Sequence, residues 1–344
     1  MRFKGSSEAF LSPGSVTSML LVALVAVFVL SFLVGRYPIS VGNVIEVLAS
    51  QVLPIKQTWP STFDTIIMEI RLPRILAAVL VGASLSIAGA AFQGLFRNPL
   101  VSPDILGVSS GASFGAALAI LFYASSSMIE VSAFSLALVA VGITYGTSKL
   151  VRGNPTLSLI LAGIAIGSLF SALLSLVKYT ADPLNQLPTI TYWLMGSLAS
   201  VSTHDLLFAA VPMLLGMSVL LLIRWRLNVV AMGEEEAMAL GVNTNRLSAI
   251  ITVCCSVVTA ASVSISGTIA WVGLVIPHIG RMLVGPDHKK LLPVTVLLGA
   301  SYLLVMDDIA RIMAEVEIPI GILTAIVGAP FFLYLLFSRR EVWA

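Results

Sequence analysis

The sequence predicts an all-α polytopic membrane protein with about ten transmembrane helices. Of its 344 residues, 58% are apolar and 10% are charged, whereas a soluble globular domain carries roughly 25% charged residues. The mean hydropathy is +1.02. Apolar runs of about 20 residues, the length that crosses about 30 Å of hydrocarbon, follow one another almost without a break. These observations exclude a soluble fold and favour a single transmembrane domain over residues 1–344.

Ten apolar stretches are placed as spans. In chain order they are residues 16–34, 66–96, 105–123, 128–148, 156–177, 206–223, two within 247–284 joined by a tight turn near Gly267, 291–306 and 321–337. Residues 1–15 are polar and lack a small-residue cleavage site after a short apolar core, so we expect no cleaved signal peptide.

Two connections predict shorter elements. Residues 35–65 contain three prolines and mixed polarity, which indicates an interfacial loop with one short helix near residues 41–53. Residues 178–201 include a 13-residue apolar stretch, which is too short to span and predicts a partial or re-entrant helix. In the third span, Gly107, Gly111 and Gly115 recur every four residues, which predicts one helix face suited to close contact.

Lysine and arginine set the orientation of the spans. An N-terminus inside the cell, with ten spans, places most lysines and arginines in cytoplasmic segments, so both termini are expected to be cytoplasmic, with residues 1–15 as a cytoplasmic N-terminal segment. A weak inverted repeat accompanies this topology. GASLSIAG at residues 82–89 recurs as AASVSISG at residues 260–267, five spans later and therefore in the opposite direction, as is common in transporters.

The longest charged interruption, residues 224–246, predicts a short capped helix. Gly233 can open a turn, and the glutamates that follow it suit the positive end of a helix dipole. Apolar residues then supply one side, and Gly241 is placed to end the helix at C′. On this pattern alone, an amphipathic loop helix lying on the membrane surface explains the segment as well as a functional element does.

The sequence offers no catalytic, metal-binding or cofactor-binding constellation. It has no GxxxxGK[ST] loop for ATP, no HExxH motif and no Cys/His cluster, and its net charge of +2 is too small to indicate a nucleic-acid partner. Asp307 and Asp308 are the candidates for ion coupling, but they lie at the outer end of a span, and Asp307 is four residues from Arg311, as in an ordinary helical ion pair. A permease without its own motor is favoured, with a proton-coupled secondary transporter or a membrane scaffold as alternatives.

Four ordered motifs resemble the FecCD family, the permease subunits of type II ABC importers for iron chelates, haem and vitamin B12. They are RLPRILAAVLVGASLSIAGAAFQGLFRNPLVSPDILGVSSGA at 71–112, the GEEEAMALGV helix, WVGLVIPHIGR at 271–281 and EIPIGILTAIVGAPFFLYLL at 317–336. The resemblance implies the type II ABC importer permease fold in a bacterial or archaeal plasma (inner) membrane. It also implies a homodimer or a pair with a similar permease, two cytoplasmic ABC ATPase subunits, and an extracytoplasmic substrate-binding protein.

The resemblance further implies three sets of site residues. The short helix between spans 6 and 7 would dock the ATPase through Gly233, Glu234, Glu235, Ala237, Met238, Leu240 and Gly241. Outer arginines would pair with glutamates of the binding protein, namely Arg71, Arg74 and Arg311. The cytoplasmic gate would comprise Asn98 and Leu100 after span 2, and Thr156 and Leu157 before span 5.

The expected pathway is lined mainly by span 5, residues 178–201 and span 10, all of which are short of charge. Such a lining suits a large ligand that passes with low affinity, and it leaves selection to the binding protein. Lys178 near the outer mouth either favours an anionic ligand or snorkels to the headgroups. Iron siderophore, haem, cobalamin and molybdate therefore all remain open as cargo.

Overall fold

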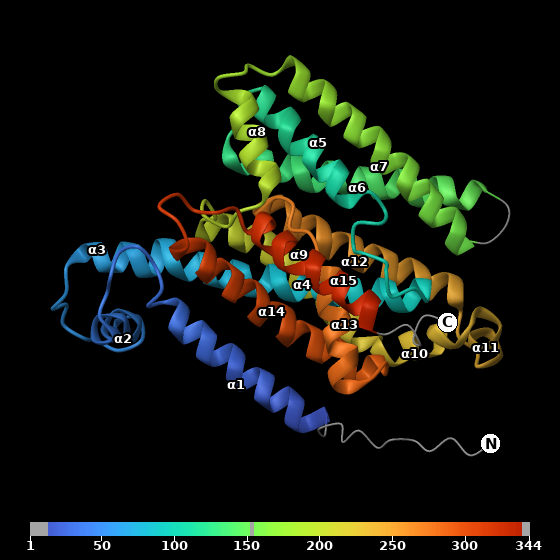
Figure 1. Ribbon diagram of the computed structural model, residues 1–344, viewed down its shortest axis with the longest axis horizontal. Coiled ribbons are helices and arrows are strands. Elements are labelled where there is room, and N and C mark those ends of the chain that lie inside the picture. Colours follow the sequence, from blue (N-terminus) through green and yellow to red (C-terminus); the bar gives the residue numbers. More distant parts are fainter. Residues whose placement is uncertain (1–12, 152–154, 339–344) are drawn as a thin grey trace.

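The computed structural model describes residues 13–151 and 155–338, and every regular element in these ranges is a helix (Figure 1). The first half contains α1 (Pro13–Ser31), α2 (Val41–Ser50), α3 (Ser61–Asp64), the π-helical η1 (Thr65–Arg71), α4 (Leu72–Phe96), α5 (Val108–Leu121), α6 (Ser126–Leu150) and α7 (Pro155–Thr180). The second half contains α8 (Gln186–Met195), α9 (Thr203–Leu222), α10 (Arg224–Met232), α11 (Glu234–Ala239), α12 (Thr244–Ser266), α13 (Val272–Val284), α14 (His288–Ile312) and α15 (Ile320–Ser338).

The multi-pass architecture is confirmed. Within the described ranges, seven helices are long and apolar enough to cross a membrane: Gly14–Ser31, Ser61–Phe96, Ser126–Leu150, Pro155–Thr180, Thr203–Leu222, Thr244–Ser266 and His288–Ile312. The other three predicted spans correspond to the shorter apolar helices α5, α13 and α15. At 1.5 Å per residue, the 13 residues of α13 reach only about 20 Å, so this helix does not cross the bilayer alone.

The helix at the centre of the bundle is α4. In its span, 83% of the apolar window is buried, and α14, α12, α13 and α9 pack around it (Figure 1). Glycines permit this packing, because a Cβ on Gly82 would collide with the carbonyl oxygen of Gly299 on α14. A Cβ on Gly89 would likewise collide with the carbonyl oxygen of Gly273 on α13. Close backbone approach at small residues is how helices associate where lipid removes the hydrophobic driving force.

The variant Gly82→Ala tests this close approach. We expect it to destabilise the protein by about 1–3 kcal/mol through overpacking, although alanine normally favours a helix over glycine by about 1 kcal/mol. Gly142→Ala on α6 is the matched control, since nothing lies within 4 Å of the added methyl group. Thermal unfolding in detergent should give a lowered midpoint for Gly82→Ala only. Equal midpoints for the two variants would contradict the contact.

The two copies of the short repeat lie on α4 and α12, which pack against each other in the buried core. The predicted turn near Gly267 is confirmed. α12 ends at Ser266, and Gly267 follows with φ +65°, a conformation that favours glycine. The small residues of both copies therefore serve close helix contact, and the relation between the copies stays a prediction.

The prediction that three glycines share one face of a helix is wrong for Gly107. This residue precedes α5 with φ +81° and lies against Gly167 of α7, whereas Gly111 and Gly115 approach the backbone of α6. Four-residue spacing places residues on one face only if all of them are helical. Here the helix begins one residue after Gly107.

Both predicted short elements are present. α2 begins where the Ser40 hydroxyl accepts a hydrogen bond from the backbone N–H of Asn43 at 3.3 Å, which is a standard N-cap. α8 is a partial helix of 10 residues that ends at Gly196, with φ +74°. The Thr268 hydroxyl donates to the carbonyl oxygen of Leu194, so the end of α8 is tied to the turn that follows α12.

One face of α7 is uncovered. Figure 1 shows α5, α6, α7 and α8 as a group on one side of the core, where α7 packs on α5 and α6. Only 17% of the apolar window of α7 is buried. Leu161, Ile164, Leu169 and Leu176 are between 52% and 59% exposed. In a membrane, a face of this kind contacts lipid or a second chain.

Candidate functional site

The charged interruption folds as two short helices, α10 and α11, separated by Gly233. The φ of Gly233 is +148°, a value that side chains with a Cβ disfavour. The prediction of one short helix was therefore correct for α11 and incomplete for α10. The available signal for α10 was the run of nine residues before Gly233, RWRLNVVAM, which contains no proline or glycine, and in the structure its Leu227 is fully buried.

The end of α11 follows the predicted capping pattern. The N–H of Gly241 donates to the carbonyl oxygen of Met238 at 2.9 Å, and the N–H of Val242 donates to that of Ala237 at 3.0 Å. Gly241 has φ +76°. These two bonds with a left-handed residue at C′ form a Schellman motif, so α11 ends through its own sequence.

The three apolar residues of α11 and its cap divide into two groups. Met238 and Leu240 are 55% and 63% exposed, but Ala237 is fully buried. Ala237 therefore cannot contact a partner as predicted, because it packs inside this chain and anchors the helix. The side chains of Glu234 and Glu235 lie outside the described residues. The exposed apolar surface of α11 and its cap is a small tip formed by Met238 and Leu240.

The prediction that three outer arginines are available to a docking protein needs correction. Arg71, Arg74 and Arg311 are each 5% exposed. Arg71 donates to the backbone carbonyls of Phe32 and Tyr37, the latter at 2.6 Å. These two bonds hold the segment after α1 against the start of α4, so Arg71 has a structural partner inside the chain.

Arg74 and Arg311 converge on Asp307. The Nε of Arg74 lies 2.9 Å from Asp307 Oδ1, and its Nη1 lies 2.9 Å from Glu317 Oε2. The Nε of Arg311 lies 3.1 Å from Asp307 Oδ2, which confirms the predicted helical ion pair. Arg311 also pairs with Asp308. Opposite charges buried together satisfy one another, so this network joins α4, α14 and the connection to α15.

The two predicted gate segments flank a small cavity, but of the four predicted gate residues only Thr156 lines it. The amide oxygen of Asn98 accepts a hydrogen bond from the N–H of Leu100 at 2.9 Å, an Asx-type turn, and Leu100 is 45% exposed. At the start of α7, Leu157 is 55% exposed. A cavity of about 70 Å³ is lined by Leu95, Arg97, Lys149, Pro155, Thr156, Val230, Thr244, Asn245 and Ser248. The end of α4, the start of α7, and both flanks of α11 therefore meet at one place.

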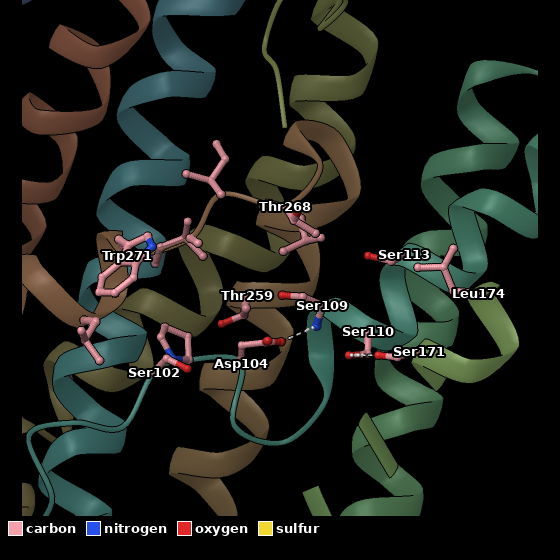
Figure 2. A pocket seen from close by; sticks show the side chains of 17 residues that line it. Ser102, Asp104, Ser109, Ser110, Ser113, Ser171, Leu174, Thr259, Thr268 and Trp271 are labelled. Carbon is pink, nitrogen blue, oxygen red and sulfur yellow. Dashed lines mark hydrogen bonds between the residues drawn. The ribbon is translucent and has the colours of Figure 1, made fainter. Parts of the chain in front are cut away.

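A larger cavity of about 310 Å³ lies between α5, α7 and α12 (Figure 2). Its lining is rich in hydroxyl groups, and Asp104 is the one charged residue among the described residues that line it. Asp104 Oδ1 accepts the N–H of Ser109 at 2.7 Å. The Thr259 hydroxyl is buried without a hydrogen-bond partner among the described residues. Such a surface can offer and accept hydrogen bonds while carrying little charge.

The walls of this cavity differ from the expected pathway. α7 contributes Ser171 and Leu174, whereas α8 and α15 contribute none of its described lining residues. The other walls come from α4, the connection between α4 and α5, α5, α12, the turn before α13 and the start of α13. Asp104 was not among the predicted site residues. The signal that could have indicated it is an acidic residue in a proline turn just before the serine-rich start of α5.

The sequence and the fold are both similar to those of known transport proteins. Residues 23–338 match the FecCD transport family. This chain belongs to that family. It is 43% identical over 327 residues to the molybdate import system permease protein MolB of Haemophilus influenzae, covering 94% of this chain and 95% of that protein. It is 40% identical over 282 residues to the hemin transport system permease protein HmuU of Yersinia pestis, covering 80% and 84%.

A solved structure agrees with the fold of this FecCD chain. It is a metal-chelate type ABC transporter in an inward-facing conformation, with a TM-score of 0.84 and 42% identity, covering 94% of this chain and 99% of that one. The FecCD chain is thus a multi-pass permease subunit of an ABC importer.

Proposed function

We propose that two copies of this FecCD chain form the translocation pathway of a binding-protein-dependent importer, which separate cytoplasmic ATPase subunits drive. The exposed tip of α11 is the observation that carries this proposal. Met238 and Leu240 are solvent-exposed at the end of a helix that is fixed by a Schellman motif and anchored by buried Ala237. An apolar tip on a rigid, charged segment is suited to insertion into a partner's groove.

The path from α11 to the gate is short. Val230 on α10 and Thr244 on α12 flank α11, and both line the small cavity that Arg97 and Thr156 also line. A push on α11 would therefore reach the end of α4 and the start of α7 directly. This arrangement supports a cytoplasmic gate at the end of α4 and the start of α7, to which we assign Asn98, Leu100, Thr156 and Leu157. We assign both termini to the cytoplasm on the distribution of lysine and arginine along the sequence.

The uncovered face of α7 supports pairing of two permease copies. Its exposed leucines lie on the helix that also contributes Ser171 to the hydroxyl-lined cavity. A second copy packed near this face would enclose a pathway between the two chains. The wall of such a pathway would be apolar with hydroxyl groups and would carry few charges.

The proposed cargo is a metal chelate, namely an iron siderophore, haem or cobalamin, with molybdate as a further candidate. Similar permeases carry names for several of these cargoes. The low charge of the cavity suits a large ligand that must leave again. Selection among these cargoes then belongs to the extracytoplasmic binding protein.

Uptake by proteoliposomes tests the proposal. Vesicles that hold the chain and its ATPase are given a binding protein charged with a labelled ferric siderophore, haem, cobalamin or molybdate. We expect ATP-dependent uptake only when all three proteins are present. Uptake by the chain alone in a pH gradient would instead support a proton-coupled secondary transporter. The pairing of Asp307 with two arginines argues against that alternative, since its carboxylate is already neutralised.

A further inference from the structure

We propose that a cavity of about 480 Å³ between α4, α10, α13 and the start of α14 binds a tetrahedral oxyanion, either a free phosphate-like ion or the phosphate of a lipid headgroup. Arg97, His278, Arg281 and His288 line it, together with Asn98 and Ala231. Asp and Glu are absent from its lining residues in the described chain. A water-accessible hollow bounded by two arginines, with no carboxylate among its described lining residues, favours an anion.

Arg281 is the residue that points most directly to an anion. It lies in the last turn of α13, and its Nη2 is shielded from solvent without a hydrogen-bond partner in the part of the chain that the structure describes. A buried charged donor without an acceptor is unfavourable. Gln93, which lines the same cavity, has an amide oxygen that is also buried and unpartnered. Any of these oxyanions offers acceptor oxygens to Arg281, and hydrogen phosphate, which keeps one O–H group, could in addition donate to Gln93.

Arg97 supplies a second guanidinium from another side. It follows α4 directly and holds a left-handed backbone conformation with φ +49°, which residues with a side chain rarely adopt. Its side chain is exposed, whereas Arg281 is partly buried. The cavity therefore has one open cationic rim and one interior cationic wall, as expected for a site that a solute enters.

The nearest carboxylate in the sequence, Asp287, is already engaged. Its Oδ1 accepts hydrogen bonds from Asn228 Nδ2 at 2.6 Å and from the N–H of Lys289 at 2.9 Å. Partial burial raises the pKa of Asp287, but these bonds and the charges of Lys290 and Lys289 outweigh burial, so its pKa is lowered overall. Asp287 is thus an ionised cap of α14, stabilised by its own partners, and it does not neutralise the arginines.

His288 is oriented by the same group of residues. The Asn228 Oδ1 accepts the backbone N–H of His288 at 2.8 Å and lies 2.9 Å from His288 Nδ1. Because an amide oxygen is only an acceptor, Nδ1 carries the hydrogen. The other ring nitrogen, Nε2, lies against Gly94, where a Cβ would collide with it. The ring is therefore held in one orientation at the edge of the cavity.

The cavity lies where a bound oxyanion would affect transport. Asn98 belongs to the proposed gate, and Ala231 belongs to α10, which precedes the proposed coupling helix. An oxyanion bound in this cavity would therefore lie between the proposed gate segment and α10. This consequence rests on the proposed function, but the binding itself does not.

Binding is measured on the purified full chain in a neutral sugar detergent, without ATPase or binding protein. Inorganic phosphate and molybdate are titrated separately by calorimetry and by thermal unfolding, against chloride at equal ionic strength. We expect saturable binding that raises the unfolding midpoint. Arg281→Gln, and Arg97→Gln at the exposed rim of the cavity, should each weaken oxyanion binding about tenfold or more. Each variant removes a charged hydrogen-bond donor.

Arg226→Gln is the control, since Arg226 is an exposed arginine of α10 that stacks on Trp225 outside the cavity. It should bind as the unmodified chain does. A second experiment tests a lipid as the source of the phosphate. Native mass spectrometry measures how much phosphatidylglycerol or phosphatidylcholine the chain retains without added phosphate. Lipid retained by the unmodified chain and lost in both cavity variants would identify the headgroup as the source.

Two outcomes would overturn the site. One is stabilisation by phosphate that is equal in the unmodified chain and in both cavity variants, which is the general effect of a salt excluded from protein surfaces. The other is the absence of both oxyanion binding and retained lipid. Failure of uptake in the reconstituted system, with binding intact, would instead count against the proposed function and leave this site in place.

Discussion

Met238→Glu should abolish ATP-driven uptake, with at least about a tenfold loss, while the chain remains folded. On the proposed docking, the Met238 side chain enters an apolar groove of the ATPase, and a carboxylate there would be desolvated without a partner. Residues at the centre of such contacts carry much of the binding energy. Because Met238 is 55% exposed, the same change should alter the folding free energy by no more than about 0.5 kcal/mol.

Met238→Leu is the matched control, because it keeps the volume and apolar character of the side chain and should retain uptake. The measurement is uptake in proteoliposomes with ATPase and binding protein, alongside the unfolding midpoint and the amount of ATPase that copurifies. We expect Met238→Glu to lose the copurified ATPase. Full ATP-driven uptake by Met238→Glu would show that the tip of α11 is not the motor contact.

Arg74→Gln should destabilise the protein by about 3–5 kcal/mol, the usual cost of removing one partner of a buried ion pair. Asp307 is fully buried and depends on Arg74 and Arg311, and Glu317 also loses its partner. The effect should appear as a large fall in the unfolding midpoint and in the yield of monodisperse protein. A docking residue would behave differently, with unchanged stability and weaker attachment of the binding protein.

Two further variants separate these roles. Arg36→Gln is the control, since Arg36 is an exposed arginine that donates a 3.2 Å hydrogen bond to the carbonyl oxygen of Ala314, and it should leave the midpoint nearly unchanged. The double variant Arg74→Met with Asp307→Leu should recover part of the lost stability, because apolar replacement of a whole buried pair is often neutral. Wild-type stability in Arg74→Gln would be decisive against the network.

Local sequence decided where the helices lie and how they end. The capping of α11 by Gly241 and the turn at Gly267 depend on residues within a few positions of one another, and both were predictable. The short α8 was predictable from the length of its apolar stretch, although its end is tied to the distant Thr268. The four motifs that resemble the FecCD family are likewise sequential, so membership of the family was accessible from the sequence alone.

Only the tertiary structure decided which of these residues face outward. Arg74 lies 233 positions from its partner Asp307 along the chain, so no local pattern distinguishes a buried ion pair from an exposed docking residue. The burial of Ala237, the placement of Gly107 against α7, and the meeting of Arg97 with Arg281 at one cavity have the same origin. Periodicity and capping are set by neighbours in sequence, whereas exposure and pairing are set by neighbours in space.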